Sequence, residues 1–123
     1  KMYQSNKKIP ISDVREARTH YEWIKKNESS LSRNVKIITV FTTTSKEIED
    51  SARQFADNIY YIHVSDFMNF VNNYIAVIRN AYTTFTEDGD YDWRNNLHNN
   101  LKTQKLLMSD IIELLTTKRL SKI

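Results

Sequence analysis

The stretch VKIITVF, at residues Val35–Phe41, is the clearest strand signal in the chain. Most of its residues are β-branched and nearly all are apolar, as expected for a strand that is covered on both faces of a sheet. A second short apolar stretch, Ile59–Val64, predicts another strand. Helical patterns separate and follow the two strands, and this alternation is typical of parallel strands joined by right-handed crossovers. The sequence therefore predicts an α/β domain built around Val35–Phe41.

Helical patterns are found on both sides of the first strand. Apolar residues recur at helical spacing after the capping hydroxyl of Ser12, and they predict a helix over residues 13–27. The segment Thr44–Glu47 has the pattern of a capping box and predicts a second helix over residues 45–57. The remaining predicted helices cover residues 66–82 and 91–118.

A chain of 123 residues fits one domain. We expect a small, mostly parallel sheet flanked by helices in an α/β core over residues 1–82. Residues 83–123 would form an acidic loop and a C-terminal helical extension packed on that core. Two strands make a poor sheet, because a parallel pair leaves both edges exposed. Either Lys1–Ile9 supplies a third strand, or another chain or a missing N-terminal segment completes an incomplete sheet.

The amino-acid composition limits the cellular compartments and the kinds of reactive site that we expect for this protein. The chain has no cysteine, which excludes disulfides, thiolate nucleophiles and cysteine-ligated zinc. No apolar run approaches the roughly 18 residues of a membrane span, and the polar N-terminus lacks the apolar segment of a signal peptide. We therefore expect an intracellular protein, in the cytoplasm or with the nucleoid or nucleus, that has no membrane partner.

The charge pattern permits contact with nucleic acid without demanding it. The formal net charge is +3. Basic pairs bracket the predicted first helix, at Lys7 and Lys8 and at Lys25 and Lys26, where they could meet a phosphate backbone. A solubilising surface is the alternative interpretation of these residues.

A run of hydroxyl side chains follows the first predicted strand. Thr43, Thr44, Ser45 and the adjacent Lys46 lie between a buried strand and a predicted helix N-terminus, where open α/β sheets bind anions. Helix capping and turn formation is the alternative. A small-ligand domain using this turn is disfavoured, because the chain has one glycine and close backbone approach to a ligand usually requires glycine.

Metal ligands have only fragmentary patterns. Asp13, Glu16 and His20 share one side of the predicted first helix, at a spacing that suits a divalent metal. Acids in the first turn of a solvated helix explain the same pattern through the helix dipole. The alternating acids of Asp88–Asp92 lack the glycine and the bidentate glutamate of a calcium loop. We therefore predict no metal site on this chain.

The order of these segments supports a resemblance to a known family. Lys1 and a polar loop are followed by IPISDVRE, at Ile9–Glu16, which opens a helix. The strand Val35–Phe41 comes next, then TTS at Thr43–Ser45 and a helix, and then IYYI at Ile59–Ile62. This order resembles the back half of the PD-(D/E)xK nucleases, which have the restriction-endonuclease-like fold, including their Mrr-like branch. The resemblance covers roughly residues 1–78 and is one of topology and pattern.

The resemblance implies a role for Lys1, which would stand at the catalytic lysine of the (D/E)xK motif. In that family the metal-binding acids precede the lysine, and they hold the Mg²⁺ that activates the attacking water. Those acids are not among these 123 residues. The resemblance thus implies a metal-dependent endodeoxyribonuclease acting on DNA, in which this chain alone does not cut. Three explanations agree with the missing acids. The chain could be a fragment, a subunit completed by another chain, or a degenerate relative that only binds DNA.

A non-enzymatic interaction module is the alternative function. The C-terminal helices would then be the docking surface for another chain or for a second copy in a homodimer. Tyr91, Trp93, Leu97 and Leu101 would be the anchors if they are exposed, since buried aromatic side chains dominate binding hot spots. If these residues instead complete the core, they carry no such function.

Overall fold

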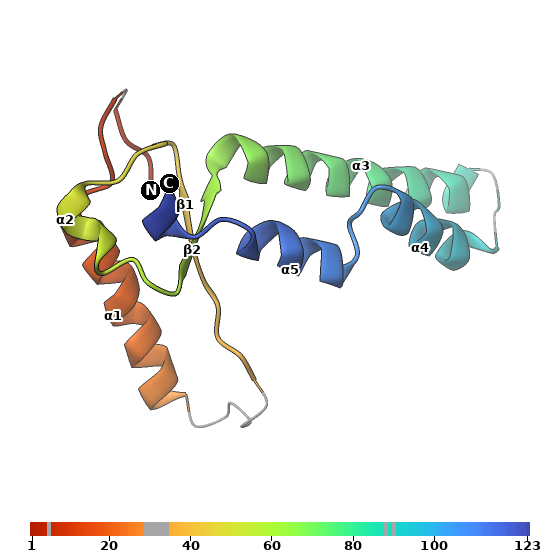
Figure 1. Cartoon of the computed structure of the whole chain (residues 1–123). Helices are drawn as coiled ribbons and strands as arrows, with labels where there is room; N and C mark the ends of the chain where they lie inside the picture. Colours follow the sequence, from red (N-terminus) through yellow and green to blue (C-terminus); the bar gives the residue numbers. More distant parts are fainter. Residues whose placement is uncertain (5, 29–34, 88, 90) are drawn as a thin grey trace. The chain divides into compact units, whose positions relative to one another are not determined.

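The computed structural model describes residues 1–4, 6–28, 35–87, 89 and 91–123. It is an α/β structure with a two-stranded parallel sheet and several helices (Figure 1). Its contacts divide the chain into two units. Unit 1 comprises Lys1–Val64 and Leu115–Ile123, and unit 2 comprises Ser65–Leu114. This division differs from the predicted boundary after residue 82, because the end of the chain returns to the α/β unit.

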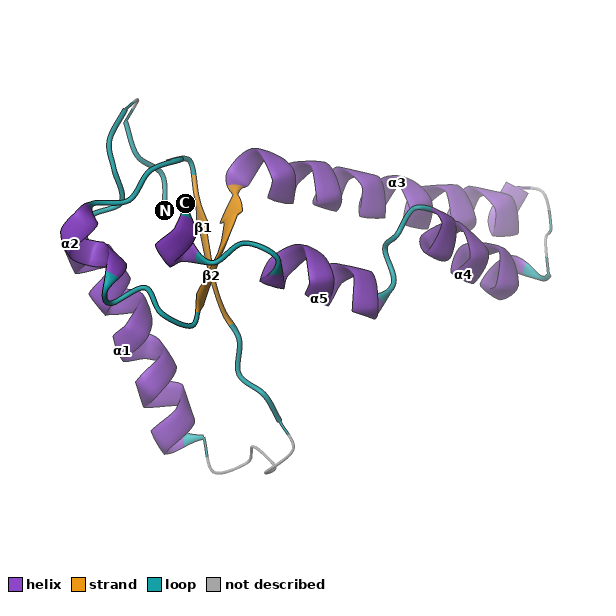
Figure 2. Cartoon of the chain, viewed as in Figure 1, coloured by secondary structure: helices purple, strands orange, loops and turns teal. Residues whose placement is uncertain are grey.

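The sheet consists of β1 (Thr39–Thr43) and β2 (Ile59–His63), which pair in parallel (Figure 2). The predicted strand over 35–41 is wrong at its start, because the ladder begins where Thr39 meets Ile59. Asn58, just before β2, has φ 64°, which takes the backbone out of the extended conformation that further pairing needs. Val35, left outside the ladder, is 51% exposed.

The two faces of the sheet are buried to different extents. Phe41 and Tyr61 lie opposite each other in the register and are 7% and 6% exposed. They join a core that contains Val14 of α1 (Ile11–Asn27) and Ala52 of α2 (Asp50–Arg53). On the other face of β1, Val40 and Thr42 are only half-buried. Their neighbour Ile62 of β2, on the same face, is 4% exposed. Strand β1 is therefore buried on one face and partly covered on the other, which is less than the complete cover expected.

Helix α2 is shorter than the predicted helix over 45–57. The hydroxyl of Ser45 does not cap a helix there. Its oxygen lies 2.7 Å from the carbonyl oxygen of Lys7 and 3.0 Å from that of Glu47, and its single proton can be donated to either. Three residues after Ser45, Ile48 forms a parallel bridge with Ile9 and is 2% exposed. Because Ile48 is buried in this extended, bridged segment, the helix begins only at Asp50.

The N-terminal segment attaches to the residues around the end of β1. The terminal amino group of Lys1 donates to the carbonyl of Thr42 at 2.5 Å, and the amide of Thr44 donates to the carbonyl of Lys1 at 3.3 Å. These two bonds, on either side of Thr43, have the pattern of a parallel strand pair. Lys1–Ile9 thus contacts the sheet at Lys1 and bridges at Ile9, but it is not a continuous third strand.

The C-terminal end of the chain completes unit 1. Arg119 forms an antiparallel bridge with Tyr60, and the amide of Tyr61 donates to the carbonyl of Lys118 at 2.8 Å. The short 3-10 helix η1 (Leu120–Lys122) follows, and Leu120 is fully buried in the core. The last residues of the chain therefore pack on the core of unit 1.

Unit 2 is helical. Its helices are α3 (Val64–Glu87), α4 (Trp93–Thr103) and α5 (Met108–Thr116). The first residue of α3 and the last two residues of α5 belong to unit 1. Helix α3 extends beyond the predicted 66–82, so residues 83–87 of the predicted acidic loop are helical, and residues 88 and 90 lie outside the described residues. The predicted helix over 91–118 is divided in two, because Lys105 has φ 56°. Among the helices of the described segments, none combines the length and apolarity needed to cross a membrane.

Candidate functional site

A cluster of charged side chains forms where the N-terminal segment meets α1. The Nζ atom of Lys1 lies 2.6 Å from Oε2 of Glu16 and 3.3 Å from Oδ1 of Asp13. The hydroxyl of Tyr3 donates a hydrogen bond to the other carboxylate oxygen of Asp13. Asp13 and Glu16 are three residues apart on α1, so they share the helix face toward the segment. The cluster therefore fixes the Lys1 side chain beside the carboxyl end of β1.

The charges of this cluster stabilise one another. Partial burial would raise the pKa of Asp13, but the hydrogen bonds from Tyr3 and Lys1 outweigh it and lower that pKa. The hydrogen bond from Lys1 also lowers the pKa of Glu16. Conversely, the hydrogen bond to Glu16 and then that to Asp13 raise the pKa of the Lys1 ammonium. Burial beside Asp13 raises the pKa of Tyr3, so Tyr3 stays a hydrogen-bond donor at neutral pH.

An open pocket of about 610 Å³ adjoins this cluster. Lys7 and Lys46 supply positive charge to its lining, and Thr44 and Ser45 supply hydroxyl groups. Tyr3 joins the pocket to the cluster, since its ring lies 5.9 Å from Nζ of Lys7 and its hydroxyl bonds Asp13. Four of the predicted nucleic-acid contacts, from segments about forty residues apart, therefore meet around one pocket.

Two other predicted contacts have partners within the protein. Thr43 is 1% exposed, and its hydroxyl accepts a hydrogen bond from the amide of Ser45 at 3.1 Å. A nucleic acid at the surface would not reach it. Nζ of Lys8 lies 3.8 Å from Glu47 in an exposed ion pair, which is weak and leaves the lysine accessible.

The basic pair at the far end of α1 does not join this pocket. The 17 residues of α1 separate the two pairs by about 25 Å of helix at 1.5 Å per residue. Lys25 lines a different pocket, with Tyr21 and Tyr60, and Lys26 lines a third, with Trp23. The predicted nucleic-acid residues thus fall into separate sites.

No group of three potential ligands that could hold a metal ion is found in the described part of the chain. Asp13 and Glu16, which the sequence placed with His20 as a possible ligand set, are engaged by Lys1. His63 contacts the carbonyl of Thr44 through Nε2 at 3.1 Å. The described residues therefore do not fit a Mg²⁺ site on their own.

Charge is distributed unequally between the two units. Unit 1 contains 14 basic and 8 acidic residues, a net charge of +6, whereas unit 2 contains 4 basic and 7 acidic residues, a net charge of −3. The net charge of +3 for the whole chain is the sum of these two opposite charges. An anionic polymer would therefore be attracted to unit 1.

Sequence reasoning missed two residues at these sites. Tyr3 carries no motif, and its contact with Asp13 spans ten residues. Arg119 reaches Tyr60 only because the chain end returns to β2. The one available signal was the apolar spacing of Leu120 beyond the predicted last helix. Comparisons with protein-family models, curated proteins and solved structures found no match to this chain.

Proposed function

We propose that this chain carries the lysine end of a PD-(D/E)xK nuclease site, with a restriction-endonuclease-like core, and that unit 1 contacts the phosphate backbone of DNA. The acids that hold Mg²⁺ in such a site would come from residues outside these 123. In this proposal Lys1 is the motif lysine. Lys7 and Lys46 contact phosphates beside it. Thr44 and Ser45 shape the same pocket, with their hydroxyl and amide donors bonded within the protein.

One observation carries the proposal. Lys1 exchanges hydrogen bonds with Thr42 and Thr44, at the carboxyl end of β1. The resemblance expects the motif lysine at that end of a strand that lies beside the next strand of the sheet. Residues more than forty positions apart have no local reason to meet, so their pairing is independent of the pattern that suggested the resemblance.

The charge of unit 1 supports the DNA-binding part. Neutralising phosphates releases condensed counterions, which favours binding by a surface with a net charge of +6. The chain's own residues would bind and orient the backbone, and Lys1 would place the positive charge of its ammonium near the scissile phosphate.

Duplex binding tests this part of the proposal. Fluorescence anisotropy of a labelled 20-base-pair duplex would be followed against salt for the 123-residue chain, for Lys7→Ala/Lys46→Ala, and for the control Arg79→Ala/Lys102→Ala in unit 2. Losing two phosphate contacts should lower the slope of log affinity against log salt by about 2. The control should match the wild type. Absence of duplex binding at low salt, or equal losses in both variants, would overturn the proposal.

A second candidate function rests on unit 2. Only Ala81 and Leu106 are buried there among the described apolar residues. The exposed large apolar residues of α3 other than Tyr74 lie at spacings of 7, 3, 4 and 3, which is the heptad pattern of a helix–helix seam. These residues are Met68 (47%), Ile75 (45%), Ile78 (40%), Tyr82 (70%) and Phe85 (43%).

We therefore infer that unit 2 is an interaction module whose α3 seam packs against a helix of a second copy. The predicted anchors behave differently from one another. Tyr91 is 93% exposed, whereas Trp93 packs on Phe85 with ring centroids 5.7 Å apart. Sedimentation equilibrium should give a dimer for the wild type and a monomer for Ile75→Asp/Ile78→Asp. A wild-type monomer at all concentrations would exclude the homodimer.

A further inference from the structure

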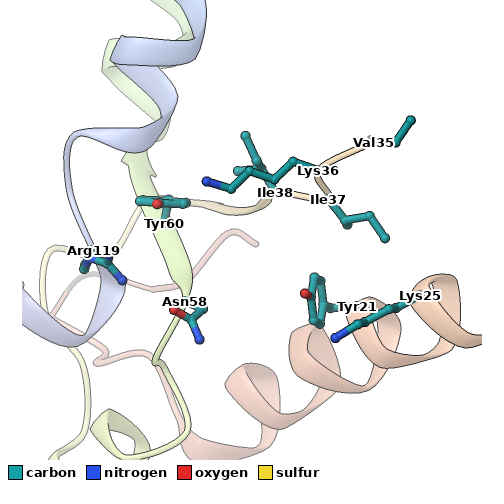
Figure 3. A pocket seen from close by; sticks show the side chains of 9 residues that line it. All are labelled: Tyr21, Lys25, Val35, Lys36, Ile37, Ile38, Asn58, Tyr60 and Arg119. Atoms are coloured by element: carbon teal, nitrogen blue, oxygen red, sulfur yellow. The ribbon is translucent and has the colours of Figure 1, made fainter. Parts of the chain in front are cut away.

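A second pocket of unit 1 lies at the amino-terminal ends of the two strands, whereas Lys1 lies at the carboxyl end of β1. Its volume is about 540 Å³, and it is lined by Ile38, which precedes β1, and by Asn58, which precedes β2 (Figure 3). Because the strands are parallel, both residues lie at the same end of the sheet, where the two strands begin. Lys1 meets β1 at its carboxyl end, so this pocket is separate from the nuclease-like site.

Two cation–aromatic pairs line the pocket. Nζ of Lys25 lies 5.8 Å from the ring centroid of Tyr21, and the guanidinium carbon of Arg119 lies 5.5 Å from that of Tyr60. Tyr21 and Lys25 are one turn apart on α1. Tyr60 and Arg119 are joined by the antiparallel bridge between β2 and the C-terminal segment. The backbone therefore holds each cation next to its ring.

The pocket is also positively charged. Lys36 adds a third cation, and no acidic residue is present among the described residues that line it. Both tyrosines are half-buried, while Lys25, Lys36 and Arg119 are exposed. Figure 3 shows α1 on one side of the opening and Asn58 with Arg119 on the other, with Lys36 and the neighbouring isoleucines above. An anion with an aromatic group suits this lining.

We propose that this pocket binds a nucleotide. A tyrosine ring would stack on the base, since every base has a π face, and the cations would hold the phosphate. The nucleotide would be either free or an unpaired residue of a nucleic-acid strand, and both sources present the same base and phosphate. This proposal does not rest on the role of Lys1, because none of the residues that line the pocket takes part in the Lys1 cluster.

The test uses a 5′-labelled thymidine decamer and the 123-residue chain. Fluorescence anisotropy would give the dissociation constant, and thymidine 5′-monophosphate would be added as competitor. The pocket variants are Tyr21→Leu, which removes one ring from a half-buried position, and Lys25→Glu/Lys36→Glu. The matched controls in unit 2 are Tyr74→Leu, at a tyrosine of α3 outside the seam that is 38% exposed, and Arg79→Glu/Lys102→Glu. Far-ultraviolet circular dichroism checks that each variant is folded.

Both pocket variants should weaken decamer binding by about 10-fold or more, while both controls stay within about 2-fold of the wild type. Competition by the mononucleotide would identify a free nucleotide as the ligand, and its failure would identify an unpaired residue of a strand. Unchanged decamer binding in Tyr21→Leu, or no decamer binding by the wild type, would overturn the proposal. Tyr21→Leu should leave duplex binding unchanged, which separates this test from that of Lys7 and Lys46.

Discussion

The Nζ atom of Lys1 lies 2.6 Å from a carboxylate oxygen of Glu16, and this ion pair joins the N-terminal segment to α1. Asp13 takes part from one helical turn earlier, with Tyr3 donating to its second oxygen. The cluster is largely solvent-exposed at Lys1 and Glu16, so its contribution to stability is modest and depends on salt. Its importance is positional, since it determines where the Lys1 ammonium lies relative to β1.

The Tyr3 hydroxyl should affect acid stability through Asp13. The folded-state pKa of Asp13 is lowered, so its stabilisation is complete above the unfolded value of about 3.9 and is lost as the pH falls through the lower folded pKa. Tyr3→Phe removes a donor and should raise the pKa of Asp13, so that acid unfolding begins at a higher pH. The carboxyl carbon shift of Asp13 against pH measures this directly.

The matched control for that substitution is Tyr82→Phe, because Tyr82 is 70% exposed in unit 2. It should leave the titration of Asp13 unchanged. An Asp13 titration that is identical in Tyr3→Phe and in the wild type would show that the hydrogen bond is not formed in solution.

Ser45 should be important for the turn after β1. Its side chain bonds the carbonyls of Lys7 and Glu47, and the residue is 8% exposed. Ser45→Ala leaves these groups without that partner and should lower the free energy of unfolding by about 1–3 kcal/mol. Urea denaturation of this variant, with the exposed Ser51→Ala as control, provides the measurement. A loss equal to that of the control would contradict the assignment.

Lys105 should be more stable as glycine. Its φ of 56° lies in the left-handed region, which costs a side-chain-bearing residue about 1–2 kcal/mol. Lys105→Gly should therefore raise stability by about 0.5–1 kcal/mol, after the greater entropy of unfolded glycine is subtracted. His98→Gly, within α4, should instead destabilise by about 1 kcal/mol. Thermal unfolding of the two variants should move in opposite directions, and a lower midpoint for Lys105→Gly would show that α4 and α5 are continuous.

The local parts of the fold could be predicted from the sequence. The β-branched residues of β1 and β2 and the apolar spacing of α1 and α3 gave these elements and their order. Element boundaries were wrong where distant residues decide them. Ile48 is extended because it pairs with Ile9, and β1 starts at Thr39 because Asn58, at positive φ, keeps the partner strand from beginning before Ile59. Neither effect has a signal within a helical or strand-length window.

The sequence predicted which types of residue form the candidate site, but it did not predict which of them lie together in the fold. Lys7, Thr44, Ser45 and Lys46 were singled out by charge and by their place after a strand, and they do line one pocket. Lys25 was grouped with them through its charge alone, although a helix length separates it. The contacts of Tyr3 and Arg119 depend on chain reversals that composition and periodicity do not encode.

Cleavage of DNA tests the proposed function most directly. Supercoiled plasmid would be incubated with Mg²⁺ and the product of the whole open reading frame that contains this chain (the in-frame protein), and with its Lys1→Ala variant. We expect Mg²⁺-dependent nicking that Lys1→Ala reduces by about 100-fold or more, while the 123-residue chain alone binds without cutting. No nicking by the in-frame protein, or equal nicking by Lys1→Ala, would contradict the assignment of Lys1.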